Sequence, residues 1–214
     1  EPRLLEPAPA GAEALALPEA KSIDAALFDV LEQRRSGRRY TGEPLSLEEL
    51  AGLCWAAQGV TKRAGAHHLR TAPSAGALYA VDLYAALPGP DPEAGVYRYS
   101  APEHALTPVL RGYAVAALST AALKQDFMAR SSVIFVMTAH PDRSVWKYEQ
   151  RSWRYFYLDA GHIGENIMLA AEAMGLASCG IGAFYDTAIN QVLVLDGVGE
   201  IPLYLVAVGR PRGG

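Results

Sequence analysis

Cysteine is scarce in this sequence, and positive charge is in deficit. Only Cys54 and Cys179 occur among 214 residues, far apart and outside any paired spacing, which argues against a disulfide framework and a zinc cluster. We therefore expect no metal site. The 19 Lys and Arg residues are outnumbered by 23 Asp and Glu, a formal net charge of -4. This balance offers no broad basic surface, so we expect no nucleic-acid partner.

Long hydrophobic runs are also missing. Although 50% of the residues are hydrophobic, the apolar stretches are broken by Gly, Ser and charged residues. None reaches the roughly 20 residues that cross a bilayer, so we expect a soluble protein with no membrane contact. The chain starts at Glu1 and shows no signal-peptide pattern, which leaves the compartment open. A cytoplasmic location is the default expectation.

Prolines separate an N-terminal arm from the rest of the chain. Residues 1–22 are rich in Pro, Ala and Glu, and a continuous helix there is excluded by Pro2, Pro7, Pro9 and Pro18. We expect an extended arm, either loose or draped over a neighbour. Residues 23–214 show no internal repeat and no domain boundary, so we expect them to form a single domain.

Hydrophobic periodicity in that domain predicts helices and a few strands. Helical spacing of apolar residues predicts helices over 23–36, with Ser22 as N-cap, and over 46–58, 113–129, 153–174 and 187–195. Apolar runs predict strands over 81–87, 96–99, 133–137 and 203–208, with 133–137 at the centre of the sheet. Strands and helices do not alternate regularly, so the predicted class is α+β.

A run of arginines follows the first predicted helix. Residues 34–40 read Arg-Arg-Ser-Gly-Arg-Arg-Tyr. Guanidinium groups match phosphate oxygens as planar forks, and a serine hydroxyl can add a donor, so an anionic ligand explains the cluster. Cations that offset the negative end of a helix dipole explain one or two of these arginines equally well. The residues alone leave both interpretations open.

A second cluster consists of small residues before the strand at 81–87. It contains Pro73, Ser74, Gly76 and Ala77. Small side chains let a flat ligand approach the backbone, and a Pro-Ser start favours a turn or helix N-terminus with free N–H groups. An ordinary loop explains the same residues, so this cluster alone does not define a site.

Glycines mark a third candidate region. Gly161 and Gly164 interrupt the predicted helix at 153–174, where each glycine costs up to about 1 kcal/mol relative to alanine. We therefore expect another helix or a cofactor to pack closely there. Residues 180–182, Gly-Ile-Gly, lack the third glycine and the following helix of a dinucleotide-binding motif.

Polar side chains near these regions have both functional and ordinary explanations. His162 is a candidate catalytic or metal-binding residue, although a hydrogen-bonded structural role is commoner for one histidine on an apolar helix. His67 and His68 are expected in a surface loop, and Arg143 is expected to be exposed.

Four motifs occur in a fixed order along the chain. They are the arginine run at 34–40, Pro-Ser-Ala-Gly-Ala-Leu-Tyr at 73–79, Asp-Ala-Gly-His at 159–162 with Asn166, and Gly-Ile-Gly-Ala-Phe at 180–184. No single motif is specific. In this order and spacing, the chain resembles the nitroreductase superfamily in its SagB-type branch, the azoline dehydrogenases. The resemblance covers about residues 23–210.

The resemblance implies a fold, a cofactor and a partner. The fold would be nitroreductase-like, with a mixed central sheet flanked by helices and a long spine helix. The assembly would be a homodimer with FMN at the interface, in two sites each built from both chains. By similarity, the phosphate and the polar edge of the flavin are held by Arg34, Arg35, Ser36, Arg38, Arg210 and Arg212. The partner-chain segment along the cofactor matches Pro73, Ser74, Gly76 and Ala77, and the segment facing the flavin ring matches Ile181, Gly182 and Ala183.

Two positions depart from the family pattern. The family often has Pro where this chain has Ala80, and Gln where it has Glu165. Glu165 places a carboxylate near the helix that would back the flavin. We expect flavin binding to survive both changes.

Lys147 and Tyr148 precede the long predicted helix and resemble the Lys-Tyr pair of azoline dehydrogenases. In that chemistry a base removes a proton from carbon while hydride goes to flavin N5, and an azoline becomes an azole. A lysine acts as such a base where burial or neighbouring cations favour its neutral form. A solvated lysine and an interface tyrosine explain the pair equally well.

Three functions therefore stay open. The first is an FMN-dependent dehydrogenase of azolines or similar rings, in a peptide or a small molecule. The second is a reductase of nitro compounds or quinones that takes NAD(P)H as co-substrate, and the third is a flavin-binding protein without turnover. Substrate choice lies in loops, which the sequence does not resolve.

Overall fold

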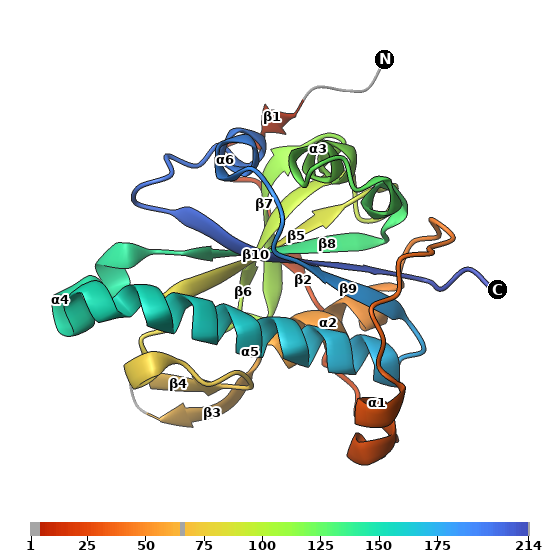
Figure 1. Cartoon of the computed structure of the whole chain (residues 1–214), viewed down its shortest axis with the longest axis horizontal. Helices are drawn as coiled ribbons and strands as arrows, with labels where there is room; N and C mark the ends of the chain where they lie inside the picture. Colours follow the sequence, from red (N-terminus) through yellow and green to blue (C-terminus); the bar gives the residue numbers. More distant parts are fainter. Residues whose placement is uncertain (1–4, 65–66, 214) are drawn as a thin grey trace.

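The chain folds around one large sheet, shown in Figure 1. The structure, a computed structural model, describes residues 5–64 and 67–213. The eight-stranded sheet has the order β1-β7-β6-β5-β8-β10-β9, and β2 also pairs with β7. Its strands are β1 (Glu6–Pro7), β2 (Leu15–Ala16), β5 (Val81–Leu87), β6 (Gly95–Ser100), β7 (Ala105–Arg111), β8 (Val133–Ala139), β9 (Ala177–Ile181) and β10 (Ile201–Gly209). A separate hairpin consists of β3 (Val60–Ala64) and β4 (His67–Arg70).

Strand β8 occupies the centre of the sheet. It pairs with β5 on one side and β10 on the other, and all 7 of its residues are buried. Its apolar residues face both ways because helices cover both faces, which confirms the predicted interior strand. The named strands pair antiparallel, and among the described residues the parallel pairing is the isolated bridge between Ser36 and Ser178.

Helices pack on both faces of this sheet. α2 (Leu47–Gln58) and α5 (Ser152–Ala173) cover one face, and α3 (Ala114–Ala121) and α6 (Asp186–Leu193) cover the other (Figure 1). α5 has 22 residues, a length of about 33 Å. The predicted α+β class with a long helix is confirmed. The short elements are α1 (Leu27–Gln33), α4 (Val145–Tyr148) and the 3₁₀ helices η1 (Ala75–Ala77), η2 (Asp126–Arg130), η3 (Pro141–Arg143) and η4 (Glu149–Arg151).

Local signals in the sequence explain where two helices begin and end. The Ser46 hydroxyl accepts from the Glu49 N–H at 3.2 Å, and the Glu49 carboxylate accepts from the Ser46 N–H at 2.7 Å. This capping box starts α2 as predicted. Gly175, with φ of +70°, follows α5 and adopts the left-handed conformation expected after a helix end.

The first predicted helix is wrong in its start, and most of its apolar residues are exposed. α1 begins at Leu27 rather than near Ser22, and its N-cap residue makes no side-chain capping bond. Val30 is its buried residue, whereas Leu27 and Phe28 are 60% and 81% exposed. The apolar stripe of this helix therefore does not enter the core of its own chain.

Other element predictions were also incomplete. The helix predicted over 113–129 divides into α3 and η2, because Leu123 and Lys124 adopt left-handed φ values of 58° and 56°. β3, β4, β7 and β9 were not predicted, and the expected surface loop at His67 and His68 is instead part of β4. No helix in the part of the chain that the structure describes has the length and apolarity to cross a membrane.

The N-terminal arm lies on the edge of its own sheet. Glu6 and Pro7 pair with β7, as do Leu15 and Ala16 further along. Leu17 is buried in the core. Pairing with the edge strand β7 covers backbone groups that an open edge would leave free.

The two mid-helix glycines of α5 have different surroundings. A Cβ on Gly164 would lie 2.7 Å from the Tyr204 ring, so this glycine allows close packing, although its neighbour is strand β10 rather than the helix or cofactor that we expected. A Cβ on Gly161 would meet no atom within 4 Å. Trp153, Tyr157 and Leu158 are exposed on α5 as well, so the helix presents an apolar stripe to the outside.

Candidate active site

The arginine segment at 34–40 lies beside the end of the sheet and the C-terminal tail. The Gly37 N–H donates to the Ser178 carbonyl at 2.8 Å, which holds the segment against β9. The Arg212 N–H donates to the Arg39 carbonyl at 2.8 Å. The fold therefore brings together two basic stretches that are far apart in the sequence.

Close packing explains why glycine and tyrosine stand in this segment. A Cβ on Gly37 would lie 2.8 Å from the Ala177 Cβ, so a larger residue would push the segment off β9. Tyr40 is 2% exposed and donates to the carbonyls of Gly37 and Ala207 at 2.9 and 3.2 Å. Burial raises the pKa of Tyr40 above its usual range, so the hydroxyl keeps its proton and anchors the segment.

The arginine side chains of the segment have few acidic partners. The Arg34 Nε lies 4.0 Å from the Glu165 carboxylate, and Arg35 donates to the carbonyls of Glu32 and Arg34. Arg38 lies 5.9 Å from the Phe127 ring. Within residues 5–64 and 67–213, neither Arg35 nor Arg38 forms an ion pair with a carboxylate.

The two C-terminal arginines differ in whether their side chains have partners within the described chain. Arg210 donates to the Glu49 carboxylate at 2.8 Å and to the Pro44 carbonyl at 3.3 Å, so its charge is offset at the start of α2. Arg212 is exposed, and its backbone is fixed on Arg39. Arg212 is thus the better placed of the two to bind an anion with the 34–38 segment.

The segment predicted to face the flavin ring begins at Ile181, the last residue of β9, and continues beyond the strand. Ile181 is buried among the residues under α3 and α6, whereas Gly182 and Ala183 are exposed. A Cβ on Gly182 would meet no atom within 4 Å, so the backbone here is open to a flat ligand. The side chain of Ile181 faces the core, which leaves its backbone as the part available to a ligand.

The small-residue segment at 73–77 is anchored on α5 and carries backbone strain. The Ala75 N–H donates to the Asp159 carboxylate at 3.4 Å, and the Ser74 hydroxyl accepts from the Tyr79 N–H at 3.0 Å. Ala77 and Tyr79 adopt left-handed φ values of 53° and 48°. Such conformations cost about 1–3 kcal/mol for non-glycine residues and occur often at functional sites.

Lys147 and Tyr148 lie directly beside this segment. A Cβ on Gly76 would lie 2.5 Å from the Tyr148 hydroxyl and 2.8 Å from the Lys147 ammonium. Gly76 has φ of +63°, so both its conformation and its close contacts require glycine. Lys147 itself is exposed on the surface of the chain.

The two halves of the predicted site lie along different parts of α5. Gly76 lies near its amino end, beside Lys147 and Tyr148, whereas Arg34 lies beside Glu165 in its carboxyl half. In Figure 1 the hairpin β3-β4 and α1 lie under opposite ends of the helix. One chain alone therefore does not bring the small-residue segment onto the arginine segment.

His162 lies on the exposed side of α5. Its neighbour in the predicted motif, Asp159, is buried and has its pKa raised by burial, although hydrogen bonds from Ser74 and Ala75 oppose that rise. Asn166 donates to the Ala56 carbonyl at 3.0 Å and joins α5 to α2. These motif residues thus position α5 and the 73–77 segment.

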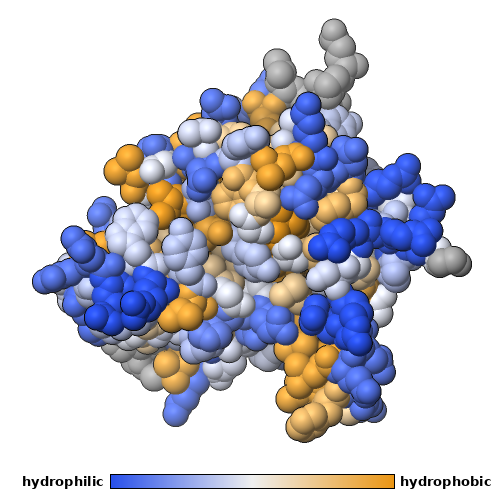
Figure 2. All heavy atoms as spheres, in the orientation of Figure 1, coloured by the Kyte–Doolittle hydropathy of each residue, from blue (hydrophilic) through white to orange (hydrophobic). Residues whose placement is uncertain are grey.

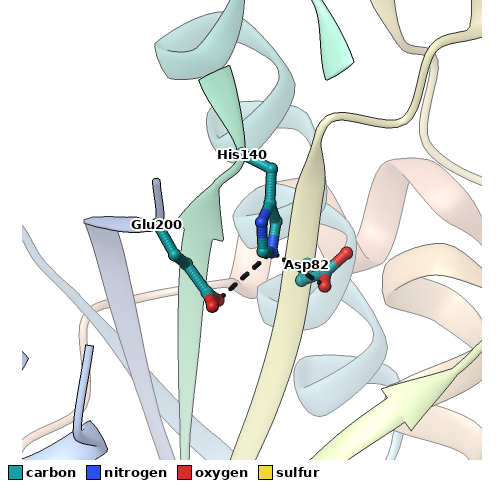
Figure 3. A group of neighbouring side chains, drawn as sticks. All are labelled: Asp82, His140 and Glu200. Carbon is teal, nitrogen blue, oxygen red and sulfur yellow. Dashed lines mark hydrogen bonds and ion pairs between the residues drawn. The ribbon is translucent and has the colours of Figure 1, made fainter. Parts of the chain in front are cut away.

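A charged cluster that the sequence did not reveal lies at one end of the sheet. Asp82 comes from β5, His140 follows β8 and Glu200 precedes β10, and Figure 3 shows their side chains pointing toward one another. The His140 Nε2 lies 3.1 Å from Asp82 and 3.3 Å from Glu200. Hydrogen bonds to Asp82 and Glu200 raise the pKa of His140 to about 9. These residues are 58 or more positions apart in the sequence, and only antiparallel pairing joins them.

The spacing of these three groups would suit a metal ion, but their partners favour an ionic network. Their ligand atoms lie within 4.8 Å of one another. Both oxygens of Asp82 accept from Arg143, so this arginine is held in an ion pair rather than exposed as predicted. One Glu200 oxygen accepts from Tyr84 at 2.8 Å and Thr138 at 2.6 Å. Arg98 also pairs with Asp82, its Nε 3.7 Å from the carboxylate. The pKa of Asp82 is held well below its usual range by hydrogen bonds from His140 and Arg143, against the opposing effect of burial.

Comparisons with known proteins agree with this fold. The nitroreductase family profile matches residues 31–210. Protein MJ1384 of Methanocaldococcus jannaschii, whose name places it among nitroreductases, is 37% identical over 195 residues, which are 91% of this chain and 94% of that protein. A crystal structure from Ralstonia eutropha JMP134, also titled as a nitroreductase, has 28% identity and a TM-score of 0.83, over 100% of this chain and 99% of that chain.

A second relative comes from toxin processing. The trifolitoxin-processing protein TfxB of Rhizobium leguminosarum bv. trifolii is 32% identical over 148 residues, which are 64% of this chain and 39% of that protein. The family profile and MJ1384 each cover most of the chain, and the fold agrees over its whole length. The chain belongs to the nitroreductase family of oxidoreductases.

Proposed function

We propose that this protein is an FMN-dependent oxidoreductase whose two flavin sites lie between the subunits of a homodimer. One observation carries the proposal: the two sets of candidate flavin-binding residues lie along different parts of α5, and that helix exposes an apolar stripe between them. A second copy packed along this stripe would bring its own Pro73, Ser74, Gly76 and Ala77 to the arginine segment of the first.

The residues present fit the phosphate of FMN. Arg34, Arg35, Arg38 and Arg212 lie around the segment fixed on β9, and their charges are at most weakly offset within the chain. A phosphate dianion needs such a surplus of donors, and charge-assisted bonds to it are the strong kind. The Ser36 hydroxyl is exposed and adds a donor beside them.

The exposed apolar surface fits a second copy of the chain. Leu27, Phe28 and Leu31 of α1 are exposed together, and Figure 2 shows the corresponding apolar area over α1 at the lower right. Tyr157 and Leu158 of α5 are 61% and 50% exposed. Contiguous apolar surface of this kind is typical of protein interfaces rather than of monomers.

Bound FMN would supply two-electron chemistry, accepting hydride at N5 and passing it to a second substrate. The chain's own residues bind and orient. Arginines at the polar edge of a bound ring would offset the negative charge of its reduced form and so favour that form. The open backbone at Gly182 and Ala183 would let a flat ring approach. Gly76, which has no side chain of its own, leaves room for the Lys147 and Tyr148 side chains beside the other segment assigned to the flavin.

Purified protein should contain non-covalent FMN at about one molecule per chain and should sediment as a dimer. The measurement is the flavin absorbance of the native protein, its release on denaturation, and sedimentation equilibrium of the same sample. NAD(P)H under anaerobic conditions then tests turnover with nitro compounds and quinones. A colourless protein that takes up no added FMN would refute the proposal. A protein that binds FMN but catalyses no reaction with any electron donor would be a flavin-binding protein without turnover.

A second candidate function is the dehydrogenation of azolines in a peptide or small molecule. It is favoured by the position of Lys147 and Tyr148 against Gly76, in the segment assigned to the flavin, and by the similarity to TfxB. At that position the pair could remove a proton from substrate carbon, provided that the partner subunit buries Lys147.

Variants of this pair separate the two candidates. If they transfer the proton, Lys147→Ala and Tyr148→Phe should keep FMN bound and slow substrate-dependent flavin reduction by about 100-fold. Reduction by NAD(P)H should scarcely change, because hydride transfer from a nicotinamide needs orientation but no protein base. Wild-type rates with every donor in both variants would remove the residue-level support for dehydrogenation.

A further inference from the structure

A basic cavity lies next to the strained segment that we assign to the flavin. It is open to the surface, has a volume of about 350 Å³, and is bordered by β4, the residues after Gly76 and η3. His68, Arg70 and Arg143 line it, with Ala77, Leu78 and Tyr79 as an apolar wall. Among the described residues that line it, none is acidic. This contrasts with the formal net charge of -4 of the whole chain.

Arg70 is held in a fixed position without an acidic partner. Its guanidinium carbon lies 4.3 Å from the centre of the Tyr79 ring, and its Nη1 donates to the Gln58 amide oxygen at 2.7 Å. Gln58 is fixed in turn, because its amide donates to the Val81 carbonyl at 2.8 Å. No carboxylate of the described chain forms an ion pair with Arg70, and its Nε is buried without a hydrogen-bond partner.

The other two polar side chains contribute in different ways. Arg143 is bound to both oxygens of Asp82, which fixes its guanidinium and offsets its charge. The Nδ1 of His68 is buried without a partner among the described residues. Burial lowers the pKa of Arg70, with Arg143 adding to that effect and Asp82 and Tyr79 opposing it. Arg70 is therefore the group in this cavity with the most to gain from an anionic ligand.

The apolar wall has a fixed shape because its backbone is strained. Ala77 and Tyr79 both have left-handed φ, and the Arg70 N–H donates to the Tyr79 hydroxyl at 3.1 Å. The tyrosine ring thus cannot move without breaking its contacts with Arg70. A fixed cation beside a fixed apolar wall suits a flat molecule that ends in an anionic group.

We propose that this cavity binds the carboxylate or phosphate group of the molecule that reacts at the flavin, with Arg70 as its principal ligand and Arg143 at the rim. The link to the flavin rests on the proposed function, because Ala77 belongs both to the cavity and to the segment assigned to FMN. Anion binding by the cavity does not rest on it. Arg70 is then a specificity-determining residue that selects acidic over neutral substrates.

Binding of matched acidic and neutral probes tests the proposal. The probes are 4-nitrobenzoate and its methyl ester, titrated by calorimetry into oxidised, FMN-loaded protein with no reductant. Arg70→Met should weaken 4-nitrobenzoate by about 10- to 100-fold, the cost of one charge-assisted bond, and should leave the ester within twofold. Arg111→Met is the matched control, because Arg111 is an exposed arginine whose Nε lies 3.7 Å from Glu93 on the far part of the sheet.

A second pair of ligands identifies the source of the anionic group. NADP+ and NAD+ differ by one phosphate and do not reduce the flavin, so a loss of binding in Arg70→Met that is confined to NADP+ assigns the cavity to a dinucleotide phosphate. A loss confined to 4-nitrobenzoate assigns it to a substrate carboxylate. If the affinities of both anions stay within twofold of the Arg111→Met control, the proposal is wrong.

The test still decides if Arg70→Met does not fold or if the protein takes up no FMN. If Arg70→Met does not fold, Leu78→Glu decides, because a carboxylate in the cavity wall should repel the same anions and spare the ester. If the wild-type protein takes up no FMN, the proposed function fails, and the same titrations on flavin-free protein still decide whether the cavity binds anions.

Discussion

Two charged regions of this molecule differ in how their charges are balanced. At the end of the sheet, Asp82 and Glu200 are paired inside the chain with Arg98, Arg143 and His140. In the segment at 34–40, the arginines have weak or no acidic partners in the described chain. The first arrangement joins strands that are distant in sequence, and the second leaves charge available to a ligand. Balanced charge thus joins strands in the first region, and we expect the unbalanced charge of the second to bind a ligand.

The largest effect should come from removing the acid at the centre of the balanced cluster. Asp82→Asn removes the carboxylate that pairs with Arg143 and one of the two that pair with His140, in a site where the Asp82 side chain is 12% exposed. Breaking a largely buried pair costs about 3 kcal/mol in the free energy of unfolding. Chemical denaturation of flavin-free protein measures it. Glu93→Gln removes a carboxylate from the exposed pair with Arg111 and should cost under about 1 kcal/mol, so equal losses would contradict the comparison.

In the segment at 34–40, a substitution should lower FMN affinity and leave the free energy of unfolding nearly unchanged. Arg38→Met should weaken FMN by about 10- to 100-fold, because one charge-assisted bond to the phosphate is lost. The free energy of unfolding of the flavin-free protein should change little, since Arg38 has no ion pair to lose among the described residues. Fluorescence titration gives the FMN affinity of the variant, and denaturation gives its free energy of unfolding. Arg111→Met is again the control, and a loss of FMN affinity there equal to that of Arg38→Met would remove Arg38 from the site.

The pH dependence of stability should come from the balanced cluster. The pKa of His140 rises from its usual 6.5 to about 9 in the folded chain, so protonated His140 stabilises the fold. That contribution is complete below the unfolded pKa and is lost as the pH rises through about 9. The thermal midpoint of the wild-type protein should therefore fall between pH 7 and 9.5 by more than that of His140→Gln. Parallel curves for the two proteins would show that His140 does not carry this charge.

The sequence predicted the fold where periodic patterns were strong. α2, α5, the interior strand β8 and the last strand β10 followed from capping, helical spacing and apolar runs. β7 was missed because its Pro108 and Thr107 interrupt any alternation, and β9 because Gly180 and Ser178 have low strand propensity. In β9 the glycine is required, since a Cβ on Gly180 would collide with the Tyr204 hydroxyl.

The candidate site was also predicted only in part. The ordered motifs identified the arginine segment and the 73–77 segment, whose binding roles stay predictions. The Asp82 cluster could not be predicted, because its members meet only through antiparallel pairing of β5, β8 and β10. The sequence also did not separate Arg210 from Arg212. In the sequence both are arginines of the C-terminal tail. They differ in the structure because Glu49, at the start of α2, pairs with Arg210.

The smallest expected effect concerns these two arginines. It tests whether an ion pair within the chain decides which of two neighbouring arginines contributes to FMN binding. Arg210→Met breaks a part-exposed ion pair with Glu49, so unfolding should become easier by about 0.5–1 kcal/mol, with FMN affinity within twofold of wild type. Arg212→Met should weaken FMN by about three- to tenfold and leave the stability of flavin-free protein unchanged, because an exposed cation near a phosphate contributes less than a fixed one. FMN titration and denaturation of both variants, at low and high salt, give the measurement. The Arg212 effect should shrink at high salt because exposed charges are screened. If Arg210→Met weakens FMN more than Arg212→Met does, the Glu49 pair does not hold Arg210 away from the phosphate, and charge balance in the isolated chain would not predict which arginines bind the cofactor.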